Sequence, residues 1–423
     1  MSLKRIVVVG MIFAIACGGW FVLGTATAVR SASLFGKLGP QVENLWGDPL
    51  VQKAPSVAVD APGIAPRWIM PLKNDITVHL DTDYRKKGLI WYPTYTCAFD
   101  GTYTITNREA LTQKIHIHFD FPDPDATYDN FAIVVDGAGG RATIDTAKGI
   151  DETLELGPGE SADFRVTYRT RGIRDWRYKM DPNVGRVQNL SLVLHAGFDD
   201  IDYTEGSLSP MTVVDTEEGV DVSWIASDLI TSEDVGVIIP EKLNPGPLTS
   251  RITFFAPVCL LFFFLLVGTI NIIYGVNIHP MHYLFVAAGF FAFHLLLSYM
   301  AGIVNIHISF IIAAIVSVVL VTTYLSAALG GKFPWKVAVG GQLFFLVLFS
   351  YSFFLSGTTG LTVAIGSVVT LAVLMRVTAK VDWNDVFARP PRKERKHVIH
   401  RPAPPSPPPA PPAPLSPQSC LTG

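Results

Sequence analysis

Between Lys242 and Val381 the chain contains no Asp or Glu, and five long apolar stretches lie within this window. One further apolar run, Ile6–Leu23, stands near the N-terminus, directly after Lys4 and Arg5. About 20 consecutive apolar residues are enough to cross the hydrocarbon core of a bilayer as an α-helix. The pattern therefore predicts a membrane protein with one N-terminal span, a large polar region, and a bundle of five further spans.

Six membrane-spanning helices are expected in total, and the ends of the apolar stretches predict their bounds: Ile6–Ala26, Ile252–Tyr274, Met281–Met300, Ile308–Leu329, Val337–Leu355 and Leu361–Arg376. This divides the chain into a transmembrane anchor over 1–29, an outer domain over 30–250, a five-helix bundle over 251–378 and a tail over 379–423. The tail is basic and then rich in proline from Arg389 to Pro417, which predicts an extended, polyproline-like segment without a core.

The orientation follows from the basic residues that flank the spans, because Lys and Arg concentrate on the cytoplasmic side. Lys4 and Arg5 precede the first span, Lys332 and Lys336 lie between the fourth and fifth, and a basic cluster follows the sixth. With six spans all of these fall on one side. Both termini are therefore predicted to be cytoplasmic, with residues 30–250 on the opposite side.

An alternative is a cleaved leader, since Ala26-Thr27-Ala28 has the small-x-small form of a signal-peptidase site. Cleavage there would leave five spans. The apolar core of a secretory leader usually runs about 7–15 residues, and the run here is longer, which favours a retained anchor.

Charge separates the two halves of the protein. Residues 30–250 hold 33 acidic and 20 basic residues, a net charge of −13, whereas the remainder carries +10. An acidic outer domain is repelled by polyanions, so no nucleic-acid partner is expected. The basic flank suits contact with the lipid bilayer.

The stretch from about 86 to 235 indicates β-structure. Ile115, Ile117, Phe119 and Phe121 alternate with polar residues, as in a half-buried strand. Further short strands are expected at Phe99–Thr106, Glu152–Leu156, Ala162–Tyr168, Leu190–Leu194, Met211–Val214 and Val220–Trp224, with a tight turn at Gly157–Glu160. This spacing predicts an antiparallel β-sandwich of immunoglobulin-like type, inserted between the first and second membrane helices.

Two side-chain patterns in the outer domain could hold a metal ion. His116 and His118 lie on one strand face at metal-ligand spacing, but the unbroken alternation favours a plain solvated face. The second pattern alternates as in a calcium loop but lacks its glycine and its final Glu, which favours an Asp/Pro-rich turn: Asp123, Asp125, Thr127 and Asp129. No metal site is predicted.

A basic cluster interleaved with Trp176 and Tyr178 could dock an acidic partner: Arg169, Arg171, Arg174, Arg177 and Lys179. The favoured interpretation places it on the outer face of two strands beside the Asp199–Asp202 run, with the aromatic rings turned inward.

Ionisable groups inside a bundle are the default functional candidates. Here the candidates are four histidines and one serine on the face of His294: His279, His282, His294, His307 and Ser298. For His294 the simpler interpretation is a neutral imidazole hydrogen-bonded to Ser298 or to a neighbouring helix. Without intramembrane carboxylates the bundle lacks the usual means of coupling proton or cation flow.

Motifs of enzyme chemistry are missing: the sequence has no His-Glu-x-x-His, no Gly-x-Ser-x-Gly and no phosphate loop. We therefore expect no catalytic residues and no cofactor.

A family resemblance rests on His279-Pro-Met-His-Tyr-Leu284, Phe293-His-Leu-Leu-Leu-Ser298, Phe310-Ile-Ile-Ala-Ala-Ile, Tyr324-Leu and Val381-Asp-Trp383. These segments resemble the CreD-type bacterial inner-membrane proteins, over residues 251–383. The resemblance implies an inner-membrane envelope protein with residues 30–250 in the periplasm. It also implies a link to a two-component regulon and to other envelope proteins, and it supplies no catalytic residue. That family often has Gln where His282 stands, which weakens His282 as a shared site.

The resulting expectation is a non-enzymatic inner-membrane protein with a role in cell-envelope integrity or the envelope-stress response. The alternative is a transporter or permease component for a neutral or anionic solute, which the histidines of the bundle keep open.

Overall fold

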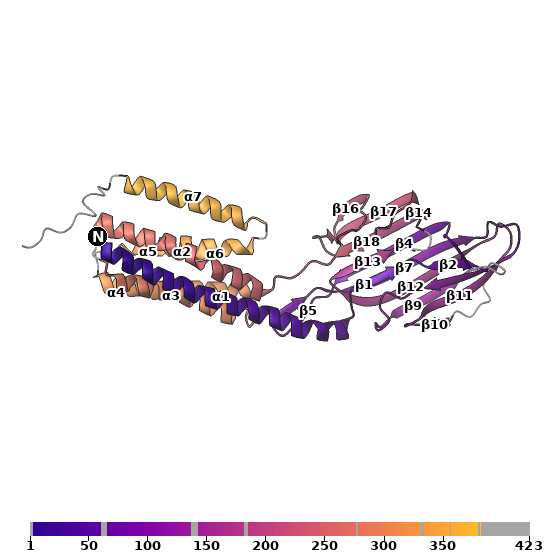
Figure 1. The fold of residues 1–423 in the computed structure, drawn as a ribbon, viewed down its shortest axis with the longest axis horizontal. Helices are drawn as coiled ribbons and strands as arrows, with labels where there is room; N and C mark the ends of the chain where they lie inside the picture. The colour runs from indigo at the N-terminus through magenta and orange to yellow at the C-terminus, as the bar shows by residue number, and fades with distance from the viewer. Residues whose placement is uncertain are drawn as a thin grey trace, which may run out of the picture.

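The chain forms a helical bundle and a β domain that lie end to end (Figure 1). The computed structural model describes residues 3–60, 66–136, 143–181, 185–275, 278–330, 334–355, 357–379 and 381. The predicted Pro-rich tail, 379–423, lies outside the described residues except for Ala379 and Val381.

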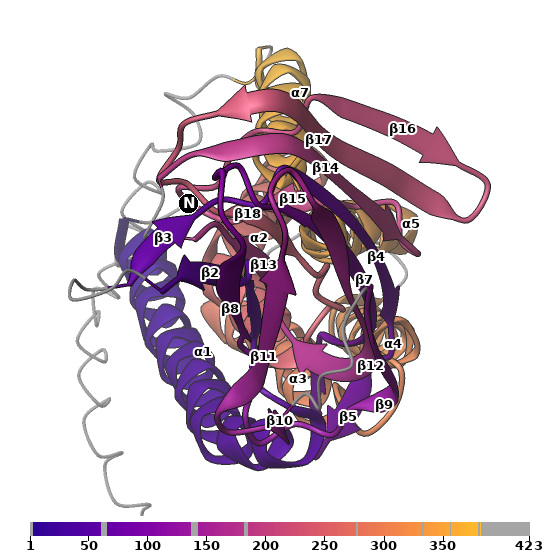
Figure 2. The same cartoon turned by 90° about the vertical axis from the view of Figure 1, so that its right-hand side faces the viewer.

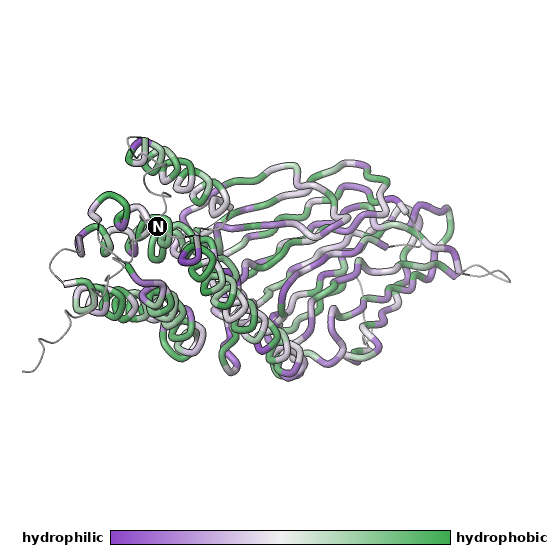
Figure 3. The backbone as a smooth tube through the Cα atoms, turned by 60° about the vertical axis from the view of Figure 1, so that its left-hand side comes forward, coloured by the Kyte–Doolittle hydropathy of each residue, from purple (hydrophilic) through white to green (hydrophobic). Residues whose placement is uncertain are grey.

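The described residues include six helices long and apolar enough to cross a membrane, which confirms the predicted number. Their apolar character shows along the bundle in Figure 3. The helices and helical segments are α1 (Leu3–Trp46), α2 (Pro245–Tyr274), α3 (Pro280–Met300), α4 (Ile306–Leu329), α5 (Trp335–Gln342), the π-helix η2 (Leu343–Leu348), α6 (Phe349–Tyr351), the 3₁₀-helix η3 (Ser352–Phe354) and α7 (Thr359–Thr378). The fifth span, expected as one α-helix, is thus built from α5, η2, α6 and η3.

The helix that contains the predicted first span, Ile6–Ala26, is longer than that span: α1 continues to Trp46 and leaves the bundle to reach the β domain (Figure 1). Leu34, Leu38, Val42 and Trp46 recur every four residues and pack against Ile90, Tyr92 and Ile173 of the β domain. A stripe at this spacing lies on one face of an α-helix. Tertiary packing on that stripe outweighs the helix-breaking tendency of Pro40, which lies inside α1.

The β domain follows α1 directly and contains three main sheets and one short hairpin. The seven-stranded sheet has the order β16-β17-β14-β4-β7-β12-β9, the five-stranded sheet β10-β11-β8-β2-β3, the four-stranded sheet β1-β13-β18-β15, and the hairpin β5-β6. The strands are β1 (Leu50–Lys53), β2 (Ser56–Val59), β3 (Arg67–Ile69), β4 (Lys73–Thr82), β5 (Arg85–Lys87), β6 (Ile90–Tyr92), β7 (Thr94–Thr106), β8 (Gln113–Phe119), β9 (Asp129–Val135), β10 (Thr143–Asp145), β11 (Gly149–Leu156), β12 (Ser161–Ile173), β13 (Asp175–Lys179), β14 (Val187–Ala196), β15 (Asp202–Tyr203), β16 (Thr212–Thr216), β17 (Gly219–Leu229) and β18 (Val235–Ile238). Figure 2 views this domain from its free end.

The prediction of a purely antiparallel domain is wrong at two pairings. β4 pairs in parallel with β14, and β1 pairs in parallel with β13. Both involve strands for which the sequence pattern predicts no element, β4 and β1, and each pairs with a strand far along the chain. Long connections allow parallel pairing, whereas tight hairpins impose the antiparallel arrangement.

The predicted strands between 99 and 224 are present. Two that follow each other in the sequence, β11 and β12, nevertheless belong to different sheets. The turn Gly157–Glu160 joins β11 to β12, with the amide of Gly157 donating to Glu160 Oε2 at 2.7 Å. These two strands do not pair with each other: β11 pairs with β8 and β10, and β12 with β7 and β9. The chain therefore changes sheets at this turn, and all three main sheets contribute to one core.

That core is aromatic. Trp176, Trp224, Tyr103, Phe119 and Phe164 are fully buried within it. The hydroxyls of Tyr103 and Tyr178 lie 3.2 Å apart in this core, and Trp224 Nε1 donates to the Leu208 carbonyl oxygen at 2.9 Å. Trp176 Nε1 has no partner among the described residues. Burying each such ring contributes on the order of 2 kcal/mol.

Candidate functional site

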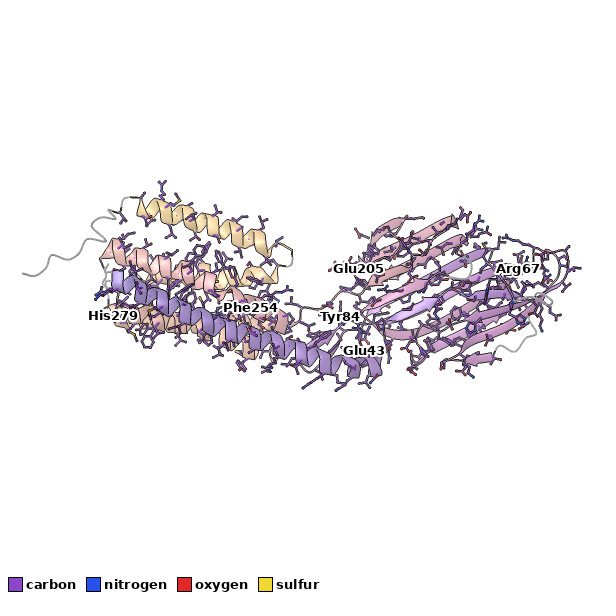
Figure 4. All side chains as sticks on the ribbon, viewed as in Figure 1. Glu43, Arg67, Tyr84, Glu205, Phe254 and His279 are labelled. Atoms are coloured by element: carbon purple, nitrogen blue, oxygen red, sulfur yellow. The ribbon has the colours of Figure 1, made fainter. Side chains whose placement is uncertain are left out.

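The five bundle candidates do not form one site. His279 is exposed at the start of α3, where its Nδ1 accepts from the Met281 amide at 3.3 Å. Figure 4 places His279 at the end of the bundle far from the β domain. The Nδ1 of His282 lies 2.9 Å from the Tyr324 hydroxyl. His307 is exposed at the start of α4 and packs on Phe354, with ring centroids 4.9 Å apart. These three positions have helix-capping or packing partners.

His294 is different, because it is fully buried and half unpaired. Its Nδ1 lies 2.9 Å from the Phe290 carbonyl oxygen. A carbonyl only accepts, so Nδ1 carries the proton and Nε2 is left as an acceptor. Among the described residues, Nε2 has no hydrogen-bond partner.

Neither of the predicted hydrogen bonds of His294, to Ser298 or to a neighbouring helix, is formed among the described residues. Long side chains on an α-helix lean toward its N-terminus. The imidazole accordingly reaches toward the N-terminus, to the Phe290 carbonyl one turn earlier. Ser298 lies one turn later in the helix, on the side from which the imidazole points away. The Ser298 hydroxyl has no partner among the described residues either.

Trp20 of α1 completes this group, and sequence reasoning missed it. Its ring is fully buried and meets His294 nearly edge-on, with centroids 5.7 Å apart and planes at 78°. The Trp20 Nε1 donor has no partner within the described chain. A buried polar group left unpaired costs about 1–3 kcal/mol. Trp20, His294 and Ser298, the buried polar trio, are therefore the part of the bundle that packing alone explains least.

A small cavity of about 110 Å³ lies beside this trio, where α1, α2 and α3 approach the β domain. Ser298 lines it from α3, Leu23 from α1 and Thr249 from α2. The Arg30 guanidinium at its edge lies over the Tyr299 ring, 5.9 Å from the centroid. The cavity volume is enough for a few water molecules.

The junction between bundle and β domain is held by side chains at the end of α1. Arg174 forms an ion pair with Glu43. Trp46 lies under two guanidinium groups, Arg85 at 4.0 Å and Arg171 at 5.5 Å from the ring. These contacts fix the orientation of α1 against the β domain.

The predicted neighbours of the basic cluster are therefore partly wrong. Trp176 and Tyr178 do turn inward and are buried. The acidic partners, however, are Glu43 for Arg174 and Asp175 for Arg177, at 2.9 Å in the second pair, rather than Asp199–Asp202. β18 separates β13 from β15, which carries Asp202.

The Asp/Pro-rich segment forms a turn on a broad groove of about 920 Å³ beside the end of α1. The buried Asp123 carboxylate accepts from the amides of Asp125, at 2.9 Å, and Asp48, at 3.3 Å. Its oxygens are thus used by the turn itself, as in an Asx-turn. Within the described ranges, no group of three or more His, Cys, Asp or Glu is arranged to hold a metal ion.

His116 and His118 lie on the half-exposed face of β8, each beside carboxylates. The His116 Nε2 lies 3.1 Å from Asp60, and the two His118 nitrogens lie 2.8 Å from Asp151 and 3.1 Å from Asp120. Partial burial lowers the pKa of His118, but its hydrogen bonds to Asp151 and Asp120 outweigh this and raise the pKa above 6.5.

Comparison with solved structures gives only distant likeness. A candidate nutrient-binding protein of Legionella pneumophila is 8% identical, with 51% of this chain and 77% of that chain covered and a TM-score of 0.29. An M1 zinc metallopeptidase of Deinococcus radiodurans is 10% identical, with 75% and 91% covered and a TM-score of 0.24. In a second structure of such an enzyme, at 12% identity and a TM-score of 0.24, 40% of this chain matches 42% of that chain. No curated protein sequence matches the chain significantly.

A family model is more informative. Residues 216–384 match the model described as "Inner membrane protein CreD". The matched region starts at Thr216, the last residue of β16, and includes β17, β18, α2, α3, α4, the fifth span and α7. It contains four of the predicted bundle histidines and Ser298. The predicted resemblance is thereby confirmed over this region: residues 216–384 match the CreD family of inner-membrane proteins.

Proposed function

We propose that this protein is a non-enzymatic component of the inner membrane that supports envelope integrity or responds to envelope stress. The observation that carries the proposal is α1, one uninterrupted helix that runs from the bundle into the β domain. The Glu43–Arg174 ion pair and the Trp46 contacts attach its end to the β domain. A change in the β domain can thus act on the packing of α1 against α2 and α3.

The β domain is proposed as the working part, in the form of a sandwich whose sheets share one core, with its surface presented to the periplasm. Sandwiches of this kind more often bind than catalyse. The groove beside the end of α1 lies where such binding would reach the helix directly. The partners expected on this basis are envelope proteins or a two-component system.

The proposed orientation places both termini in the cytoplasm. Lys4, Lys336 and Arg376 lie near helix ends remote from the β domain, which supports this choice through the cytoplasmic bias of basic residues. The β domain then occupies the periplasm.

The test is a gene deletion complemented by variants. Deletion should alter sensitivity to envelope-active agents without abolishing uptake of any single nutrient. Glu43→Gln combined with Trp46→Ala should fail to complement at normal expression, because it loosens α1 from the β domain. Val29→Ala is the control on the same helix, since Val29 is 61% exposed and does not line the groove beside the end of α1. Full complementation by the double variant would contradict the proposal.

A transporter for a neutral or anionic solute is the second candidate, and the buried polar trio favours it. Unpaired donor and acceptor atoms inside a bundle can bind a solute that passes through it. Solute-dependent flux through the purified protein in liposomes, abolished by His294→Ala in a folded variant, would replace the first proposal with the second.

A further inference from the structure

A groove of about 490 Å³ opens where the bundle meets the β domain. One wall comes from the link into α2, with Lys242, Leu243 and Arg251. The other comes from η3 and the start of α7, with Phe353, Phe354 and Thr359. The groove adjoins the small cavity, with which it shares Ser31 and Ile90, but no residue of the buried polar trio lines it.

Two cations border this groove. Arg251 is exposed on α2 and forms no hydrogen bond or ion pair with any residue that the structure describes. Lys242 is exposed and lies over the rings of Tyr84, at 4.4 Å, and Trp91, at 4.7 Å. Glu241 lines the same groove, so the three charges sum to +1. The groove therefore favours an anion, and Arg251 is free to bind one.

The sequence after Arg251 predicts that its side chain lies at the depth of the lipid headgroups. Arg251 directly precedes the uncharged stretch of α2 from Ile252 to Ile273, which matches the thickness of a hydrocarbon core. Long basic side chains at such a boundary reach into the headgroup layer. A phosphate in that layer would meet Arg251 without any movement of α2 along the membrane normal.

The floor of the groove is apolar and continues toward the hydrocarbon. Phe353 and Phe354 are half-buried, and Leu248 is buried behind them. On α7, among its described residues, Thr370 is the one buried side chain, while Leu361 and Ile365 near its start are exposed. Figure 1 shows α7 at the edge of the bundle. An acyl chain attached to a phosphate at Arg251 would therefore find an apolar surface beneath it.

We propose that this groove binds the headgroup of an anionic phospholipid from the leaflet nearest the β domain, with Arg251 and Lys242 contacting the phosphate. The proposal goes beyond the proposed envelope role and stands whichever way the protein is oriented. The bound lipid would contact α2, the start of α7 and the link between the β domain and α2 at the same time.

The test uses the full chain in detergent and native mass spectrometry, with phosphatidylglycerol and phosphatidylcholine of identical acyl chains as probes. One basic residue near an anionic lipid changes the affinity roughly fivefold. The wild-type protein should thus bind one phosphatidylglycerol on the order of 30-fold more tightly than phosphatidylcholine. Arg251→Gln and Lys242→Gln should each remove about fivefold of this preference, and the double variant nearly all of it.

Two controls keep the result specific. Arg30→Gln removes a cation at similar depth outside the groove, and Lys114→Gln removes an exposed cation far out on β8. Both should keep the preference. The melting temperatures of Arg251→Gln and Lys114→Gln should match the wild type because these side chains are exposed. Lys242→Gln and Arg30→Gln also lose contacts with aromatic rings and should melt slightly lower. An equal affinity for the two lipids, a preference that survives in the double variant, or its loss in Arg30→Gln would overturn the proposal. Displacement of phosphatidylglycerol by excess inorganic phosphate would overturn it in favour of a free-phosphate site.

Discussion

Trp20 of α1 and His294 of α3 meet nearly edge-on inside the bundle, with ring centroids 5.7 Å apart. Neither Trp20 Nε1 nor His294 Nε2 has a hydrogen-bond partner among the described residues. The contact holds the long N-terminal helix against the third span. It also leaves an acceptor, His294 Nε2, and a donor, Trp20 Nε1, in a buried environment. Loss of packing at Trp20 should therefore destabilise the protein, whereas removal of the unpaired acceptor at His294 should not.

His294→Leu keeps most of the volume and removes the unpaired acceptor, so stability in detergent should be equal to or above that of the wild type. Trp20→Ala leaves a cavity and should lower stability by about 3–5 kcal/mol. Thermal melting by fluorescence size exclusion measures both.

Under the proposed function, His294→Ala is tolerated or mildly destabilising in cells. A complete null phenotype in a well-expressed, folded His294→Ala protein would identify the bundle as the working part.

Close contact between α3 and α4 gives a second prediction. The Ser317 hydroxyl donates to the Gly289 carbonyl oxygen at 2.7 Å, and a methyl group added at Gly289 would collide with the Val321 side chain. Gly289→Ala should therefore cost about 1–3 kcal/mol through overpacking. Gly340→Ala is the matched control, because nothing lies within 4 Å of an added methyl there. Equal melting temperatures for the two variants would contradict this account of the helix contact.

The number of membrane helices was predictable because twenty apolar residues in a row have few alternatives in water or lipid. The strands around Ile115–Phe119 were predictable because alternation at period two is a local signal. The sheet order was not, since β4 and β14 become neighbours only through the whole domain. Nothing in the residues flanking Gly157–Glu160 indicates that the chain changes sheets there.

The missed part of α1 has a physical explanation. Gly36, Gly39 and Pro40 are local signals for a break, whereas the four-residue spacing of Leu34, Leu38, Val42 and Trp46 is a signal for a helix. The second signal wins because Ile90, Tyr92 and Ile173 bury that stripe, and these residues come from later strands. Trp20 was missed for a similar reason: among apolar neighbours its indole nitrogen has no distinguishing pattern until His294 is placed beside it.

The end of α1 should loosen when its aromatic anchor is removed. Trp46 lies under Arg85 and Arg171, and such contacts contribute roughly 0.5–1 kcal/mol each at exposed sites. Trp46→Ala should reduce amide-exchange protection over residues 34–46 while leaving α2 unchanged. Leu45→Ala, which removes an exposed side chain, should have no effect on exchange. Unchanged protection in Trp46→Ala would show that the Glu43–Arg174 pair and the apolar stripe suffice.

His118 predicts a pH dependence with a definite sign. Its pKa in the folded protein is raised above 6.5 by Asp151 and Asp120, in spite of partial burial. A raised pKa means that protonation favours folding, so the contribution is fully present below the unfolded pKa and is lost as pH rises through the folded value. The wild type should exceed His118→Gln in melting temperature more at about pH 5.5 than at about pH 8.5, on either side of the ordinary histidine pKa. Lys114→Gln on the same strand should show no such difference, and a gap that widens with pH would reverse the assignment.

The membrane topology can be tested with reporter fusions. Fusions after Lys4, Lys336 and Thr378 should report the cytoplasm, and fusions after Thr127 and Gly357 should report the periplasm, because the basic flanks all fall on one side of six spans.

Signal-peptidase cleavage after Ala28 would instead separate residues 1–28 from the rest of α1. Since Trp20 packs against Phe291 and His294, and Ser250 donates to the Gly24 carbonyl at 3.0 Å, cleavage would also remove part of the bundle core unless the cut segment stays bound. N-terminal sequencing of the mature protein decides this point: a start at Met1 or Ser2 supports the six-span topology, and a start at Val29 contradicts it.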